Sequence, residues 1–427
     1  MDHLLFAGYL ILFAWLVTKV PFFTKTGLTP AQLIILFLVK VMAGIFYGWI
    51  GIYYGELAQM VDTWAFHYES LKEYQLLLSH PQEFFSSLFH NTYKAGYGEF
   101  LSSENSWWND LHGNLFIKIL ALFNVASFGN YYVNVIFYSF ISLFGPMAIY
   151  RVMINEYPQS KVGVLIATFL IPSFIYWTSG LHKDGIIFLG LSLIIYNLYF
   201  FLKNKKLSIR GIFFIILGFV LILGLRNYLI INLIPALIAW LVAERFLKNV
   251  KPLVVFSICY LIYIAIFFTA GYLTPKLNFP EAVVAKQQAF LKLEGSSEVK
   301  TKELTPTLGS FIKNAPQAVS LSLLRPFPTD VKHLLSLAAA VEINFILLLF
   351  LFVLTCKSNI YITPFILFSI FLSFSILMTI GYTVNFLGAI VRYRSIIFPL
   401  LITPIISSIN WQKINKLLIY IKIKNNV

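Results

Sequence analysis

The chain has 427 residues, of which 59% are hydrophobic and 12% are charged, and it carries a formal net charge of +14. Globular proteins carry about a quarter charged residues, so this composition excludes an ordinary soluble domain. The apolar runs are continuous rather than alternating, which excludes the strand pattern of a membrane barrel. The sequence therefore predicts an all-α polytopic membrane protein, whose immediate partners are membrane lipids.

In chain order, about eleven apolar runs are long enough to cross a bilayer. They are 4–23, 32–54, 132–152, 162–180, 185–202, 208–225, 227–243, 252–274, 334–355, 361–381 and 391–410. Because Asp2 precedes the first run where a signal peptide would be basic, we expect a retained helix. We expect residues 1–427 to form a single membrane domain, with a basic amphipathic cytoplasmic tail at 411–427.

Two polar segments interrupt the apolar runs. Residues 55–131 contain many carboxylates and histidines, and the short stretch 114–128 carries Lys118. We expect this stretch to lie along the membrane surface as an interfacial helix. Residues 275–333 form the second polar segment, and LGSFIKNAPQAVSLSLLRPFP near its end predicts another interfacial helix.

The short basic loops all fall on one side if the N-terminus is outside and the C-terminus is cytoplasmic. This orientation explains the net charge, and no basic stripe interleaved with stacking aromatics indicates a nucleic-acid partner. We therefore expect a multi-pass protein of a bacterial inner membrane. The polar segments and Asp62, the turn 182–184, Arg226 and Arg392 would then face the outside.

Asp62 lies in DTWAFHY, just after an early apolar run. A carboxylate there can act as a general base, but an Asp at the start of a helical pattern is equally typical of an N-cap. The sequence HKD, formed by His182, Lys183 and Asp184, lies between two apolar runs. Ionisable groups so close to hydrocarbon are costly and are therefore functional candidates. The alternative is a polar turn with Lys183 reaching the headgroups.

Arginines on the expected outer side are candidates for binding an anion, because their planar fork matches phosphate oxygens. Arg392 and Arg394 are the stronger candidates, since basic residues are unexpected outside, and Arg226 and Arg325 are the weaker ones. The alternative for each is an ion pair with a carboxylate of the outer segments. Glu342 is a candidate partner for one of them.

The remaining candidates are histidines and aromatics of the first polar segment. His67, Tyr68, Trp107 and His112 are expected to contact substrate, and Trp107 can either stack on a sugar or belong to an interfacial aromatic belt. No histidine pair has the spacing of metal ligands, so we predict no metal site, although the use of a divalent cation stays open. Cys259 and Cys356 indicate neither a disulfide framework nor a metal site.

The order of these motifs resembles the GT-C superfamily of membrane glycosyltransferases, in particular its protein-mannosyltransferase-like bacterial branch. The resemblance is carried by Asp62 after an early span, by PSFIYWTSGLHKDGIIFLGLSL with Asp184, and by Arg392-Tyr393-Arg394 followed by Pro399. The chain departs from the family in an extra span ahead of Asp62 and in Thr63 where a second acid would stand. The second departure weighs against a metal-assisted site.

The resemblance implies an inverting glycosyltransferase on the outer face of the membrane. A polyprenyl-phosphate carrier would supply the sugar, and the acceptor would be a lipid, a glycan or a protein. Asp62 would be the general base and Asp184 a second catalytic carboxylate. His182, Lys183 and the arginines would hold the substrate and stabilise the developing phosphate charge.

Two other functions remain open. A polysaccharide polymerase of the O-antigen or capsule type would use a glycan-loaded pyrophosphate carrier, and its arginines would matter more than Asp62. A flippase or transporter would show related halves and polar sites at the membrane midplane. The sequence shows no related halves and no midplane polar residues beyond Lys40 and Glu342.

Overall fold

The computed structural model describes residues 2–53, 62–89, 107–206, 208–356, 362–411 and 413, without the side chains of residues 107–110 and 112. Within these ranges eight helices are long and apolar enough to cross a membrane, or ten if each of two bent pairs counts as one span. The eight are α3 (Pro30–Tyr53), α8 (Tyr131–Glu156), α11 (Lys183–Asn204), α12 (Ile209–Arg226), α13 (Tyr228–Leu241) with its π-helical end η2 (Val242–Phe246), α14 (Pro252–Leu273), α17 (Leu334–Thr355) and α18 (Pro364–Thr383). No strand forms among the described residues, so the prediction of an all-α multi-pass membrane protein is confirmed.

Prolines bend two of the runs that the sequence predicts as single spans. Helices α9 (Lys161–Phe169) and α10 (Pro172–Ser179) meet at 45°, and α19 (Leu387–Ser395) and α20 (Phe398–Ser407) meet at 69°. Pro172 and Pro399 lie in the first turn of the second helix of each pair. A proline has no N–H to continue the helical hydrogen bonds, and it keeps the preceding residue out of helical geometry.

The first apolar run also differs from the expectation. Helix α1 (Asp2–Val17) has 16 residues, and the short helix α2 (Pro21–Thr24) follows it. A span needs about 20 residues, and here Thr18, Lys19 and Pro21 interrupt the run. Eleven spans are therefore not confirmed within the described ranges.

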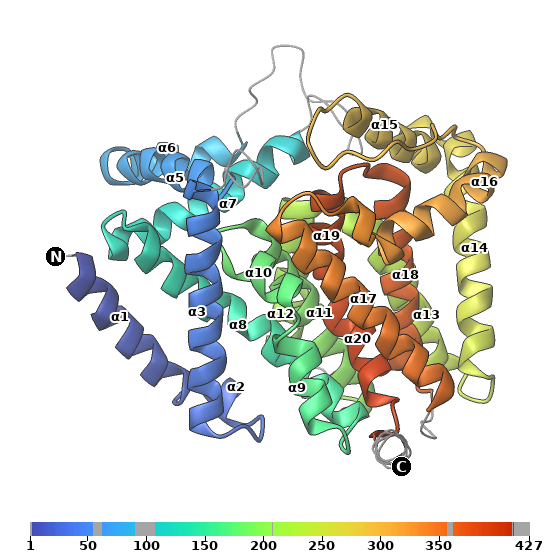
Figure 1. Ribbon diagram of the computed structural model, residues 1–427, viewed down its shortest axis with the longest axis horizontal. Coiled ribbons are helices and arrows are strands. Elements are labelled where there is room, and N and C mark those ends of the chain that lie inside the picture. Colours follow the sequence, from blue (N-terminus) through green and yellow to red (C-terminus); the bar gives the residue numbers. More distant parts are fainter. Residues whose placement is uncertain are drawn as a thin grey trace, which may run out of the picture.

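Short helices gather at one end of the spans, the upper end in Figure 1. From the first polar segment come α5 (Asp62–Ser79), α6 (Pro81–Ser86), η1 (Ser87–Phe89) and α7 (Trp107–Ser127). From the second come η3 (Pro275–Leu277), α15 (Phe279–Leu291), α16 (Leu308–Val319), η4 (Ser320–Leu324) and η5 (Pro328–Asp330). The stretch after α15 is tied to the start of α19, because Val299 N donates to Asn385 O at 2.8 Å and Leu387 N donates to Ser297 O at 2.9 Å.

The basic loops lie together at the opposite end of the spans. Lys203 Nζ donates to Asn155 Oδ1 at 3.2 Å, and Thr363 Oγ1 donates to Glu156 Oε2 at 2.6 Å. The guanidinium of Arg245 lies 4.8 Å from the ring centre of Phe201. These contacts join the ends of α8, α11 and η2 to the start of α18. The basic loops that the sequence assigns to one side therefore lie at one end of the spans. Which side of the membrane each end faces stays a prediction.

Candidate active site

Asp184 is the centre of a charged cluster at the end of the spans that carries α5 and α15. Its side chain is fully buried in the first turn of α11. Its Oδ1 lies 2.7 Å from Arg226 Nη2, and its Oδ2 lies 2.9 Å from Arg392 Nε and 2.8 Å from His182 Nδ1. A buried carboxylate is stable only when it is paired. The end of α12, the turn before α11 and the last turn of α19 therefore converge on Asp184.

Asp62 joins the same cluster from α5. Its Oδ2 accepts a hydrogen bond from Arg392 Nη1 at 3.2 Å and lies 3.7 Å from His182 Nε2, and about half of its side chain is exposed. Its neighbours His182 and Arg392 lower the pKa of Asp62 to about 2, against the opposing effect of burial. The carboxylate is therefore ionised at neutral pH. Its contacts with Arg392 and His182 tie the start of α5 to α19 and to the turn before α11.

His182 is held between the two carboxylates. Its Nδ1 is close enough to donate to Asp184, which leaves Nε2 to accept the hydrogen bond from Arg392 Nη2. The hydroxyl of Tyr138 donates to the His182 carbonyl, and a Cβ at Gly185 would collide with that hydroxyl. Only a glycine therefore lets α8 approach the turn so closely.

Lys40 supports the turn from α3. Its ammonium group, 3% exposed, donates to Thr178 O at 2.8 Å, near the C-terminal end of α10. A cation is favourable there because the carbonyls at the end of a helix carry a partial negative charge. Lys40 therefore pairs within the bundle, with a carbonyl that lies four residues before His182 in the chain.

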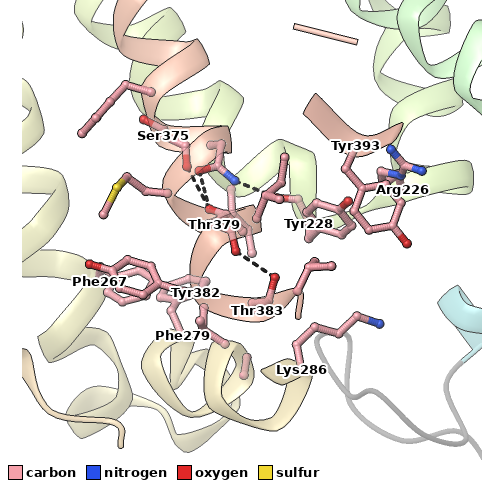
Figure 2. Close-up of a pocket in the computed structure, with 18 of the residues that line it drawn as sticks. Arg226, Tyr228, Phe267, Phe279, Lys286, Ser375, Thr379, Tyr382, Thr383 and Tyr393 are labelled. Carbon is pink, nitrogen blue, oxygen red and sulfur yellow. Dashed lines mark hydrogen bonds between the residues drawn. The ribbon is translucent and has the colours of Figure 1, made fainter. Parts of the chain in front are cut away.

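A cavity of about 820 Å³ extends from this cluster between the spans. Asp62, Lys183, Arg226 and Arg392 line its polar end. Its apolar walls come from α13, α14, α15, α16 and α18 and include Tyr263, Phe267, Phe268, Phe279, Phe311, Phe374 and Met378. Figure 2 shows Arg226 and Tyr393 on one side of the cavity and Phe267, Phe279 and Tyr382 on the other. This division suits a ligand with a charged head and a hydrocarbon chain.

Lys286 is a residue of this cavity that the sequence did not reveal. It reaches in from α15 on the Arg226 side (Figure 2). Burial lowers the pKa of Lys286, and the positive charge of Arg226 lowers it further. No feature of the sequence separates Lys286 from the other lysines of residues 275–333. With it, four cations and one carboxylate line the described part of the cavity, a balance that favours an anionic ligand.

Two of the predicted arginines lie outside this cavity. Arg325 Nη1 lies 3.5 Å from Asp330 Oδ1, and its side chain lines a separate cavity. Arg394 is fully buried, and it donates to the carbonyls of Ser322, at 3.0 Å, and Arg325. Glu342 forms no ion pair with an arginine among the described residues; instead, it accepts a hydrogen bond from Ser173 N at 2.6 Å.

The aromatic and histidine candidates of the first polar segment are also separate from the cluster. His67 is buried on α5, 5.9 Å from Trp64 and 5.3 Å from Tyr131 between ring centres. Tyr68 is 58% exposed and does not line the cavity. The side chains of Trp107 and His112 lie outside the described residues.

No group of three His, Cys, Asp or Glu side chains in the described ranges is placed to hold a metal ion. Arg392 lies between Asp62 and Asp184 and contacts both, through Nη1 and Nε respectively. The cation that neutralises this pair of carboxylates is therefore supplied by the chain itself.

Comparison of the chain with protein-family models, with curated proteins and with solved structures found no match in any of the three. Its function is therefore inferred from the geometry of the cluster and the cavity.

Proposed function

We propose that the protein is an inverting glycosyltransferase that moves a sugar from a polyprenyl-phosphate carrier to a hydroxyl-bearing acceptor at the membrane surface. The observation that carries this proposal is the single cavity that joins the charged cluster to apolar helix walls. A polyprenyl-phosphate sugar has the same division, because a polar sugar phosphate is attached to a long hydrocarbon chain.

The phosphate of the sugar donor would lie at the cationic end of the cavity. Arg392 offers a planar fork for two phosphate oxygens, and Lys183 and Lys286 offer point charges. Arg226 pairs with the buried Asp184, whereas Arg392 contacts Asp184 through Nε and the half-exposed Asp62 through Nη1. Arg392 can therefore exchange Asp62 for the phosphate while it stays paired with Asp184. Binding of the sugar donor therefore competes with Asp62 for Arg392.

This competition gives Asp62 its proposed role as the general base. Once Arg392 turns to the phosphate, Asp62 loses its cationic neighbour and becomes a better proton acceptor. Asp62 then takes the proton of the acceptor hydroxyl, whose oxygen forms a bond to the anomeric carbon. The bond from that carbon to the phosphate oxygen breaks, and its electron pair leaves with the polyprenyl phosphate. Arg392 and Lys183 stabilise the charge on this leaving group, and a single displacement inverts the anomeric configuration.

A polysaccharide polymerase with a pyrophosphate-linked carrier is a second candidate. It is favoured by the excess of basic residues over carboxylates along the cavity, because a carrier-linked pyrophosphate carries more negative charge than the phosphodiester of a polyprenyl-phosphate sugar. Products would distinguish the two functions, since a polymerase makes ladders of repeats and a transferase adds single sugars. A polymerase would also depend on Arg392 more than on Asp62.

The proposal is tested with purified protein in liposomes and a panel of polyprenyl-phosphate-linked sugars. We expect Asp62→Asn to remain in the membrane and to lose transfer by about 10²–10⁴-fold, the usual contribution of a general base. Asp2→Asn, which removes the carboxylate at the start of α1, is the matched control. Transfer by Asp62→Asn at the rate of the unmodified protein would overturn the assignment.

A further inference from the structure

A second cavity, of about 610 Å³, lies on the other side of α19. Its walls come from α3, α10, α17, the start of α19 and the stretches 296–300 and 325–333. Trp177 forms part of its wall, and the guanidinium of Arg392 lies 5.6 Å from the centre of the Trp177 ring. The indole therefore separates this cavity from the charged cluster.

Two buried polar atoms beside this cavity have no hydrogen-bond partner among the described residues. Glu342 is 7% exposed; its Oε2 accepts from Ser173 N at 2.6 Å, whereas its Oε1 is unpaired. Ser173 is 8% exposed, and its Oγ, which lies beside the Glu342 carboxyl group, forms no hydrogen bond of ordinary geometry among the described residues. Both residues line the cavity. Leaving such buried atoms unpaired is unfavourable, so the cavity is built for a ligand that supplies hydrogen bonds.

The charge balance of this cavity differs from that of the first cavity. Its described lining contains three cationic residues and three carboxylates: Lys300, Arg325, Lys332, Glu298, Asp330 and Glu342. One of these pairs, Arg325 and Asp330, is already in contact. The cavity therefore has no excess of positive charge to attract a phosphate, and the buried carboxyl group of Glu342 offers it a hydrogen-bond acceptor.

Aromatic residues complete the wall of this cavity. Phe46, Tyr176 and Trp177 line it from α3 and α10. Flat apolar ring faces next to hydrogen-bonding side chains suit sugar rings, which have apolar C–H faces and hydroxyl edges. We propose that the second cavity binds a neutral, hydroxyl-rich, sugar-bearing molecule. This binding site does not rest on the proposed function, because the Trp177 indole separates it from the charged cluster.

The binding site is tested with the full chain in lipid nanodiscs and two photoreactive probes. One is an alkyl glucoside and the other an alkyl phosphate, and both carry the same diazirine-bearing chain. We expect the glucoside to label peptides from α10 and α17, and the phosphate to label peptides from α13, α14 and α15. Glucoside labelling confined to α13–α15, or equal labelling of α10 and α17 by the phosphate, would overturn the inference.

Three substitutions on α17 make the test specific. Ala338 lines the cavity, so Ala338→Trp fills it, and we expect glucoside labelling of α10 to be lost. Val341 lies on the same helix, is 62% exposed and does not line the cavity, so Val341→Trp is the matched control. Glu342→Gln keeps an oxygen for Ser173 N, and we expect it to weaken glucoside binding by about 10-fold, because an amide N–H group replaces the unpaired acceptor oxygen. Labelling that persists in Ala338→Trp would contradict the proposal.

The outcomes also separate this inference from the proposed function. Glucoside labelling of α10 and α17 in a protein that transfers no sugar would overturn the proposed function and leave the binding site standing. Sugar transfer without labelling of α10 and α17 would overturn the binding site and leave the proposed function standing.

Discussion

At the scale of single residues, Asp62 and Asp184 share the same cationic partner but differ in their surroundings. Asp184 is fully buried and also pairs with Arg226, whereas about half of the Asp62 side chain is exposed to the cavity. The first carboxylate is therefore part of the structural framework of the cluster. The second is free to exchange its partner for a substrate.

This difference predicts unequal losses of stability from two matched substitutions. Asp184→Asn leaves buried cations without a counter-charge, and we expect it to lower the free energy of unfolding by about 3–5 kcal/mol. Asp62→Asn removes a half-exposed ion pair, for which we expect a loss below about 1 kcal/mol. Denaturation of the purified variants in detergent measures both values. Equal losses would show that the two carboxylates have the same structural role.

His67 predicts a specific sensitivity to acid. Burial lowers the pKa of His67 to about 4, below its ordinary value of 6.5. The unfolded chain therefore binds a proton more readily, so stability is lost as the pH falls from about 6.5 to 4. We expect His67→Gln to reduce this loss by up to roughly 3 kcal/mol, measured by denaturation across that range. His80→Gln, at an exposed histidine, is the control, and an unchanged acid profile in His67→Gln would contradict the expectation.

The sequence could predict which charged residues share one end of the molecule, but it could not select the arginine of the site. Arg392 and Arg394 are two residues apart, and successive residues of a helix turn by about 100°, so they point in widely different directions. The packing of α19 turns Arg392 to the carboxylates and Arg394 to η4. That choice depends on contacts with distant segments, which a local pattern does not contain.

At the scale of secondary-structure elements, one buried lysine joins the helices of the first polar segment. Lys118 Nζ of α7 donates to Glu73 Oε2 at 2.7 Å, to Phe84 O at 2.6 Å and to Ser87 Oγ at 2.9 Å. These bonds join α7 to α5, α6 and η1. Since Asp62 begins α5, these hydrogen bonds also help to position the proposed general base.

We expect Lys118→Met to destabilise this group of helices, because it leaves the Glu73 carboxylate and the Phe84 carbonyl without the donor that they share. The cost should be about 1–3 kcal/mol, with faster amide hydrogen exchange in α6 and η1. Lys72→Met is the matched control, because Lys72 is exposed and its contact with Glu69 lies at the surface. Equal exchange in the two variants would rule out this role of Lys118.

The sequence predicts which segments form spans better than it predicts the angles at which they bend. Continuous apolar runs identify α3, α8, α11, α14 and α17 well, because their length and composition are sufficient. The bends before Pro172 and Pro399 also follow from proline chemistry, but their angles depend on the neighbouring helices. The α1 run appears long enough only when Thr18, Lys19 and Pro21 are counted as apolar.

At the scale of the whole molecule, charge and cavities are arranged along the spans. The cluster of Asp62, Asp184 and Arg392 lies at the end that carries α5 and α15, and the basic loops lie at the other. Two cavities flank α19, one with an excess of cations and one with balanced charge. We infer that α19 presents one arginine between a lipid-phosphate site and a sugar site.

The position of the basic loops at one end of the spans predicts the orientation of the chain in the membrane. In a background without Cys259 and Cys356, we expect a membrane-impermeant maleimide to label Lys292→Cys in intact cells. Lys248→Cys, in the exposed loop before α14, should react only after the cells are made permeable, because basic loops face the cytoplasm. Labelling of both positions from the same side would contradict this orientation.

The central claim is that one cavity holds a lipid phosphate at Arg392 and its hydrocarbon chain along α13, α14 and α18. The most direct measurement is an electron cryomicroscopy structure of the protein in nanodiscs with polyprenyl phosphate. We expect the phosphate within about 4 Å of the Arg392 guanidinium, with Arg392 turned away from Asp62. A phosphate bound elsewhere, with the contact between Arg392 and Asp62 intact, would contradict the claim.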